Sequence, residues 1–157
     1  YIDYPRKAEL FPVGRLDLDT EGLLLLTNDG AQAHRMLSPR HHVEKTYFAR
    51  VRGRLAEADV ESFAEGMDIG EKRLTLPAKL HILEPVQTEA ISEAEVTLCE
   101  GKFHQVRRMF AARGCEVLYL KRISMAGLTL DETLAPGSWR ELTEEETERL
   151  YTYAEAD

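Results

Sequence analysis

Polar and apolar residues alternate along residues 45–52, a pattern typical of a half-buried β-strand. The stretch is rich in aromatic and β-branched residues, which favour extended backbone. Because successive side chains of a strand point to opposite faces, Tyr47, Ala49 and Val51 share one face. We therefore expect Tyr47 to lie next to small apolar neighbours.

Other stretches also show the spacing of strands. The apolar run at 23–27 is closed by an Asn-Asp-Gly turn, which predicts a buried strand. Residues 74–83 and 90–99 alternate and bracket a Pro-containing segment at 84–87, so we predict an antiparallel pair. Two more strands are expected, at 116–123 and 128–130.

Four segments have the apolar spacing of short helices. In residues 103–113, Val106, Met109 and Phe110 fall on one stripe, and Gly114 follows as a C-terminal cap. The other helices are expected at 31–37, at 58–64 up to Gly66, and after Thr143. No linker or repeat divides the chain, so the mixture of elements predicts one α+β domain over residues 1–157, with a mixed, largely antiparallel central sheet and flanking helices.

The charge of the chain gives two conflicting indications. Its 157 residues carry 20 Lys and Arg against 28 Asp and Glu, a formal charge of −8, which argues against a nucleic-acid partner because phosphates bind clustered cations. Residues 34–54 and 101–122, however, each carry a net charge of +5, while acids are concentrated at 55–100 and 131–157. The basic islands are either solvated faces or an anion-binding surface, and charge alone does not decide.

The cysteine content and the hydropathy narrow the class of protein. Cys99 and Cys115 are too few for a disulfide framework, and no metal-ligand spacing such as C-x-x-C occurs. No apolar run approaches the ~18 residues of a membrane span. We therefore expect a cytoplasmic protein with no cofactor, no metal and no membrane partner.

The densest polar segment is residues 14–22. A calcium loop starting at Asp17 would need a bidentate Glu at its twelfth position, which is Asn28, so that interpretation fails. A glycosidase is disfavoured as well, because Asp17 and Asp19 are too close in sequence to form an opposed pair across a substrate. What remains is a carboxylate two residues after Arg15, which either pairs with that arginine or caps a turn, or performs chemistry.

A second polar segment opens the helix predicted at 103–113. After a glycine, its polar residues are placed to face an anion: His104, Gln105, Arg107 and Arg108. Taken alone, His104 is more often a surface or core histidine than a catalytic one. Neither cysteine has a basic neighbour in sequence that would mark it as a nucleophile.

Three segments, in this order, resemble the motifs of one enzyme family. GRLDLDTEGLLLLTNDG is similar to the signature of the pseudouridine synthases of the RsuA/RluA group, and KTYFARV and EGKFHQVRRMF resemble that group's second and third motifs. Similarity continues through LAPGSWRELTEEE, and within the group the chain most resembles the RsuA family. The resemblance implies the pseudouridine synthase catalytic fold. It also implies an isomerase that detaches uracil from its ribose, turns the ring and rejoins it through C5 without a cofactor.

The resemblance also implies roles for single residues. Asp17 matches the catalytic aspartate, which acts on the ribose as nucleophile or as base at C2′. Tyr47 matches the tyrosine that stacks on the base, and Arg107 matches the basic residue that pairs with the aspartate. The expected substrate-binding residues are Arg15, which would help hold the flipped nucleotide, Leu120, which would pack under the ring, and Lys45, Gln105 and Arg108. An aromatic surface together with cations suits a nucleotide that has been extruded from its strand.

By the same resemblance, the expected substrate is 16S ribosomal RNA, at the uridine of position 516, in a 30S assembly intermediate, with the enzyme acting as a monomer. The alternatives are a 23S ribosomal RNA synthase of the RluB, RluE or RluF kind and a non-catalytic RNA-binding or ribosome-assembly module. A binding module has no need of a carboxylate such as Asp17 facing phosphates. Members of the group usually begin with a small RNA-binding domain and a first catalytic strand. Neither precedes Tyr1, so we expect the catalytic domain with its front removed.

Overall fold

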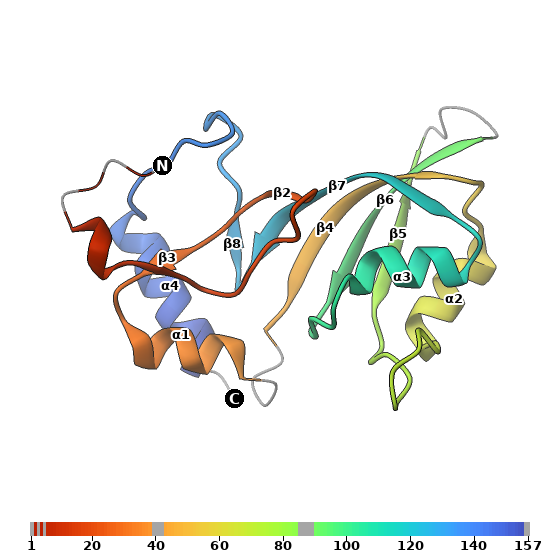
Figure 1. Cartoon of the computed structure of the whole chain (residues 1–157), viewed down its shortest axis with the longest axis horizontal. Coiled ribbons are helices and arrows are strands. Elements are labelled where there is room, and N and C mark those ends of the chain that lie inside the picture. Colours follow the sequence, from red (N-terminus) through yellow and green to blue (C-terminus); the bar gives the residue numbers. More distant parts are fainter. Residues whose placement is uncertain (1, 3, 5, 39–42, 85–89, 156–157) are drawn as a thin grey trace.

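The computed structural model describes residues 2, 4, 6–38, 43–84 and 90–155. A long twisted sheet runs through the molecule, with helices packed below it at both ends (Figure 1). Its strands lie in the order β2 (Glu21–Gly22), β7 (Glu116–Met125), β4 (Lys45–Arg52), β6 (Ile91–Leu98) and β5 (Lys79–Leu83), and β8 (Leu128–Thr129) pairs with β7. The β2–β7 pair is parallel and the other described pairs are antiparallel. The expected α+β class with a mixed, largely antiparallel sheet is confirmed.

The helices form close to where the sequence predicts them. They are α1 (Gly30–Leu37), α2 (Glu57–Glu65), α3 (Gln105–Ala112) and α4 (Glu144–Glu155), preceded by a short 3-10 turn, η1 (Lys7–Glu9). The predicted glycine caps are confirmed, because Gly66 and Gly114 follow α2 and α3 with φ values of 92° and 76°, which favour glycine. Among the described residues, no helix is both long and apolar enough to cross a membrane.

The face of β4 predicted from its alternation is the one that packs. Ala49 and Val51 are completely buried, and Tyr47 lies partly buried against the same cluster. Helices α2 and α3 cover this face, where the rings of Phe63 and Phe110 lie with their centroids 5.1 Å apart. Burial of each such side chain stabilises the fold by about 1.5–3 kcal/mol. This first cluster holds β4 rigidly under the site described below.

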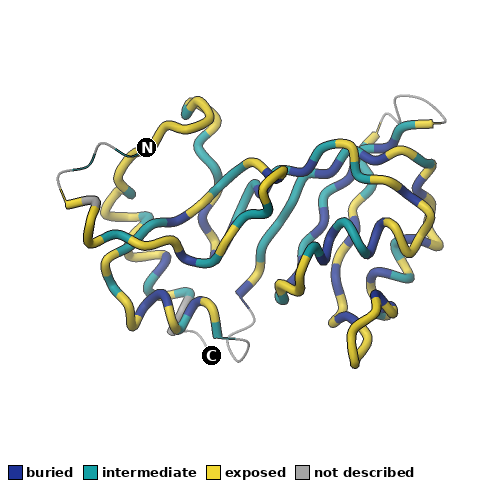
Figure 2. Tube along the Cα trace, in the orientation of Figure 1, coloured by how far each residue is buried: buried dark blue, intermediate teal, exposed yellow. Residues whose placement is uncertain are grey.

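A second hydrophobic cluster lies at the other end of the sheet, as the buried segments of Figure 2 show. Helix α1 contributes Met36, α4 contributes Leu150, and the end of β7 contributes Met125. Strand β7 therefore spans both clusters, because its Leu120 belongs to the first. Strand β7 is therefore anchored by one cluster on each side of the part of the sheet that lies between them.

The prediction of one buried strand at 23–27 is wrong. The chain instead forms β2 before the leucines and β3 (Leu26–Thr27) at their end, and β3 pairs with β1 (Phe11–Pro12) in a separate two-stranded sheet. Leu25 is buried, but Leu24 is 40 % exposed. The leucine run changes its hydrogen-bonding partner within a few residues. The N–H of Leu23 donates to the carbonyl of Arg122 in β7, whereas the carbonyl of Leu25 accepts from the N–H of Val13. Four leucines in a row carry no periodicity that could reveal such a switch.

The strand predicted at 74–83 is half as long as expected. Its first residues bond back to the end of α2 and the segment after it, with the N–H of Thr75 donating to Met67 and that of Ala78 to Phe63. Strand β5 then pairs antiparallel with β6, as predicted. Most of the connection predicted at 84–87 lies outside the described residues.

Candidate active site

A cavity of about 560 Å³ lies where the two hydrophobic clusters meet. Leu98, Val106 and Leu120 of the first cluster line it together with Met36 and Met125 of the second. Pockets of about 300–1,000 Å³ commonly hold small ligands, so the volume is sufficient for one nucleoside.

The loop between β1 and β2 brings Asp17 to the wall of this cavity. The chain bends at Gly14, whose φ is 79°, and a turn closes where the N–H of Thr20 donates to the carbonyl of Asp17 at 2.9 Å. The side chain of Asp17 is 34 % exposed, and its Oδ1 lies 3.9 Å from Nε2 of His104. A half-open carboxylate thus faces an imidazole at the edge of the cavity.

His104 is held in an uncommon conformation. Its φ of 50° and ψ of 36° are left-handed, which a non-glycine residue adopts at some cost in energy, and it stands immediately before α3. Its ring stacks on that of Phe103 with centroids 3.9 Å apart and an angle of 18°. The sequence predicts that His104 faces an anion, but it does not predict the contact with Asp17. No spacing in the sequence could connect them, because the contact joins distant loops.

Arg107 does not pair with Asp17, contrary to the role that the resemblance implies. Its Nη2 lies 3.3 Å from Oδ1 of Asp19 and donates to the Asp19 carbonyl at 3.2 Å. Arg107 lies one helical turn beyond His104, where it reaches the next acid of the same loop. Arg107 therefore fastens the loop that carries Asp17, from outside the cavity.

Arg108 is also engaged elsewhere. One end of its guanidinium donates to the carbonyl of Ile69 and, at 3.1 Å, to the carboxylate of Glu71, while Nη1 donates to the carbonyl of Phe103 at 2.9 Å. These contacts tie α3 to the segment after α2. Arg108 is not among the residues that line the cavity.

Gln105 lines the cavity but uses its amide to shape the wall. Its Nε2 donates to Oε1 of Glu100 at 2.8 Å, and its Oε1 accepts from the N–H of Lys102 at 2.9 Å. The same Glu100 oxygen accepts from the N–H of Leu76 at 2.7 Å. Since Gln105 is only 4 % exposed, it acts as a clamp for the loop before α3.

Strands β4 and β7 form the sheet side of the cavity. Tyr47 lies opposite Arg122 in the register, and Ala49 lies opposite Leu120, so the four residues share one face. Lys45 lies on the same face, where burial first, and then the positive charge of Arg122, lower its pKa. From the sequence, Arg122 is predicted only as one member of the second basic island. The signal in the sequence is that Arg122 stands two residues after Leu120, because side chains two apart in a strand lie on the same face.

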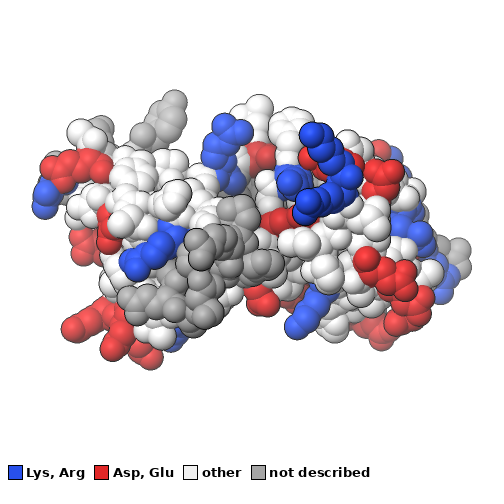
Figure 3. Space-filling model, turned by 90° about the horizontal axis from the view of Figure 1, so that it is seen from below, with Lys and Arg blue, Asp and Glu red and all other residues white. Residues whose placement is uncertain are grey.

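Of the eight residues that the resemblance singles out, six line the cavity and two do not. The six are Arg15, Asp17, Lys45, Tyr47, Gln105 and Leu120, and the two are Arg107 and Arg108. Among the described residues, the basic side chains of the lining are Arg15, Lys45, Lys102 and Arg122. Lys45 belongs to the first basic island and Lys102 and Arg122 to the second, whereas Arg15 lies outside both. Figure 3, the underside of the molecule, shows a group of basic side chains near the middle with some acidic ones beside it, and further acidic groups toward both ends.

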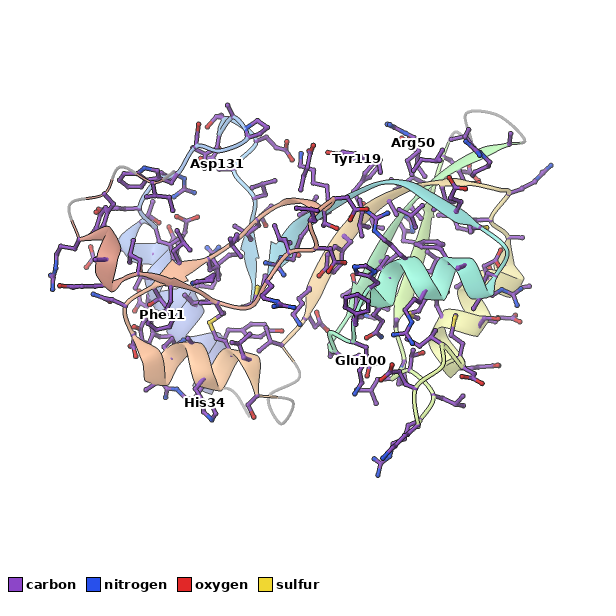
Figure 4. All side chains as sticks on the ribbon, viewed as in Figure 1. Phe11, His34, Arg50, Glu100, Tyr119 and Asp131 are labelled. Atoms are coloured by element: carbon purple, nitrogen blue, oxygen red, sulfur yellow. The ribbon has the colours of Figure 1, made fainter. Side chains whose placement is uncertain are left out.

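The first basic island is split between the two faces of the sheet. Arg50 points away from the cavity, toward Tyr119 and on the side opposite to Glu100 (Figure 4). It pairs with Glu93 at 2.9 Å, and its Cζ lies 5.8 Å from the centre of the Tyr119 ring. Arg50 therefore lies outside the surface that surrounds Asp17.

The fold and this cavity define a class of enzyme. Residues 1–112 match the family model of RNA pseudouridylate synthase, and the chain belongs to that family. It is 47 % identical over 147 residues to ribosomal small subunit pseudouridine synthase A of Escherichia coli (strain K12), covering 93 % of this chain and 61 % of that protein. It is 49 % identical over 144 residues to the uncharacterized RNA pseudouridine synthase YtzG of Bacillus subtilis (strain 168), covering 92 % and 59 % of the two chains.

Solved structures agree with this family. A crystal structure of a pseudouridylate synthase matches with a TM-score of 0.87 at 45 % identity, covering 95 % of this chain and 63 % of that one. The archaeal box H/ACA sRNP Nop10–Cbf5 complex matches with a TM-score of 0.59 at 19 % identity over 80 % of this chain and 42 % of that one, which shows the fold alone. The chain spans about three fifths of the length of the curated relatives it matches.

Proposed function

We propose that this chain isomerises a uridine of 16S ribosomal RNA to pseudouridine, with residues 1–157 forming one catalytic domain. The observation that carries the proposal is Asp17, a half-open carboxylate in the wall of a nucleoside-sized cavity whose sheet side presents Tyr47 and Leu120. The family supports the reaction, and the names of the relatives that act on the small subunit support the substrate.

The cavity fits a nucleotide that has left its stack. An enzyme that works on a glycosidic bond must extrude the base, and the extruded ring needs a flat apolar surface. Tyr47 and Leu120 share the sheet face that provides this surface. Arg15 and Lys102, both exposed in the lining, are available to the phosphates on either side of the extruded nucleotide.

Asp17 then acts on the ribose. It either attacks C1′ or removes the proton at C2′, and in both cases the C1′–N1 bond breaks with its electron pair staying on uracil. The ring turns and C5 bonds to C1′. In the first route this breaks the bond between Asp17 and C1′, and in the second route C2′ regains its proton from Asp17. The C5 proton is then lost and N1 gains a proton, so the reaction is balanced without any other reagent. His104 orients the carboxylate, and Arg107 secures the loop through Asp19.

The context of the reaction belongs to the same proposal. The substrate is the small-subunit RNA in a 30S assembly intermediate, at the position-516 uridine, in the cytoplasm. We expect one copy of the chain to suffice, because Asp17, Tyr47 and Leu120 already line one cavity within a single chain.

Asp17→Asn tests the proposal. Pseudouridine is mapped by chemical modification and primer extension in 16S RNA, in 23S RNA and in 30S assembly intermediates. We expect the unaltered protein to form pseudouridine in the small-subunit RNA and Asp17→Asn to be slower by at least about 10³-fold, because a group that acts at the reacting atoms is lost. Asp68→Asn, an exposed carboxylate on the segment after α2, serves as the control and should retain full activity.

Other outcomes separate the alternatives. Pseudouridine in 23S RNA alone would make the chain a large-subunit synthase. Binding without pseudouridine on any of these RNAs would leave a non-catalytic RNA-binding module. Full activity in Asp17→Asn would disprove the assignment of the site.

A further inference from the structure

Arg122 is a buried cation with an incomplete set of partners. It is only 2 % exposed and is the largest of the fully buried side chains. Its Nε donates to the carbonyl of Leu23 at 2.9 Å, but its Nη2 is buried with no hydrogen-bond partner among the described residues. Arginine stays protonated in proteins, so this nitrogen carries a donor that nothing in the described part of the chain satisfies.

The surroundings of Arg122 make this donor costly. A charged group removed from water without an acceptor is strongly destabilising. In the described chain, no carboxylate lies within ion-pair distance of Arg122, and Lys45, which lines the same cavity, adds a second positive charge. Thr20, also in the lining, has a buried hydroxyl that lacks a partner. Unsatisfied polar groups in native structures call for an explanation. The described residues hold four such side-chain atoms, and two of the four, on Arg122 and Thr20, belong to residues that line this cavity.

The register of the sheet indicates which part of a substrate meets Arg122. Tyr47 lies directly opposite Arg122, and Leu120 is two residues before it on the same face. A ring lying against Tyr47 and Leu120 therefore has an edge at Arg122. The polar edges of uracil carry two carbonyl oxygens, and these become the main sites of negative charge when the C1′–N1 bond breaks and its electron pair stays on the ring.

We propose that Arg122, which lines the cavity, is a further catalytic residue, whose guanidinium donates a hydrogen bond to a carbonyl oxygen of uracil and stabilises the negative charge of the ring while it is detached from ribose. This inference rests on the proposed function. Arg122 keeps its own protons throughout: it neutralises charge and transfers nothing. A donor that is fixed before the reaction begins costs no reorganisation when the charge develops.

Substitution of Arg122 tests the proposal with RNA whose target nucleotide is uridine, 2-thiouridine or 4-thiouridine. The single-turnover rate constant and the Kd for RNA are measured for the unaltered protein, Arg122→Gln, Arg122→Lys and the control Arg50→Gln from the opposite face. We expect Arg122→Gln to lower the rate with uridine by about 10²–10³-fold, as loss of one such donor does, with Kd changed less than threefold. Arg122→Lys should recover part of the rate, and Arg50→Gln should leave it unchanged.

The thio-substituted RNAs distinguish a direct contact between Arg122 and uracil from a purely structural role of Arg122. Sulfur is a weak acceptor, so one of the two should slow the unaltered protein by about tenfold and slow Arg122→Gln far less. An equal slowing of both proteins would overturn the proposal, because it shows that Arg122 does not contact that atom. If thermal melts show that the variants do not fold, the test rests on the unaltered protein. The proposal is then overturned if neither 2-thiouridine nor 4-thiouridine slows the unaltered protein. If the unaltered protein forms no pseudouridine at all, it is the proposed function that fails, and this inference falls with it.

Discussion

At the scale of single residues, the Asp17 carboxylate has an imidazole nitrogen 3.9 Å away and stays partly open to solvent. His104 approaches its carboxylate from the loop before α3, and Arg107 holds the same loop of Asp17 through Asp19. The left-handed backbone at His104 costs energy, of order 1–3 kcal/mol, that the surrounding structure must offset. Strain of this kind, next to a carboxylate in a cavity wall, indicates that the position of the imidazole matters.

We predict that His104→Asn slows pseudouridine formation by about tenfold. Asparagine tolerates the left-handed conformation, so the substitution removes the imidazole without straining the backbone further. Single-turnover rates and thermal unfolding are measured together with His34→Asn, a control on the exposed side of α1, which Figure 4 shows away from Glu100. An unchanged rate in His104→Asn would remove His104 from the site, and a fall in melting temperature that accounts for the whole loss would make its role structural.

At the scale of elements, α4 begins with a reciprocal cap. The N–H of Glu146 donates to Oγ1 of Thr143 at 3.1 Å, and the N–H of Thr143 donates to the Glu146 carboxylate at 2.9 Å. Arg140 donates to both carboxylate oxygens of Glu146, at 2.7 and 3.0 Å. The hydrogen bonds of Arg140, and then of the Thr143 N–H, lower the pKa of Glu146 to about 2. This cap anchors the helix that closes the second cluster.

The lowered pKa predicts a pH dependence of stability. A carboxyl whose pKa is lower in the folded state binds its proton more tightly after unfolding, so its contribution is complete above its ordinary pKa of 4.5 and is lost as the pH falls toward about 2. Urea unfolding at several pH values should show this loss in the unaltered protein and a flatter profile in Glu146→Gln. Thr143→Ala, which removes the other half of the cap, should cost about 1 kcal/mol at every pH. Parallel profiles for the unaltered protein and Glu146→Gln would contradict the assignment.

Elements whose apolar residues recur at a regular spacing could be predicted from the sequence. The residues that these elements contribute to the cavity could be predicted as well. Strand β4 alternates, so the face of Tyr47 was predicted correctly. The leucine run has no regular alternation, so the change of pairing partner between β2 and β3 could not be predicted. A sum of charges treats Arg122 and Arg50 alike, although one is buried under the cavity and the other is paired on the far face. Arg107 pairs with Asp19 because folding brings the loop before β2 close to α3. The spacing of residues in the sequence does not predict this contact.

At the scale of the whole molecule, an acidic protein can present a basic cavity because its charges are sorted by position. The formal charge is −8, yet the described part of the cavity lining holds four basic residues against Asp17 and Glu100. Screening limits the reach of the distant acids to about 8–10 Å at physiological salt. The phosphates of an RNA bound over Asp17 therefore meet mainly the local cations, and the net charge of the chain does not decide whether RNA binds.

This sorting predicts different salt dependences for the two faces of the sheet. Arg15→Gln with Lys102→Gln should weaken binding of a single-stranded target RNA and reduce the slope of log K against log salt by about 1.4, since each phosphate contact in single strands contributes about 0.7. Arg50→Gln with Arg52→Gln removes the same charge from the opposite face, where both residues already pair with acids, and should leave the slope unchanged. Filter binding at several salt concentrations measures both. Equal losses for the two pairs would mean that RNA responds to total charge, and a loss confined to the second pair would place the RNA on the other face, away from Asp17.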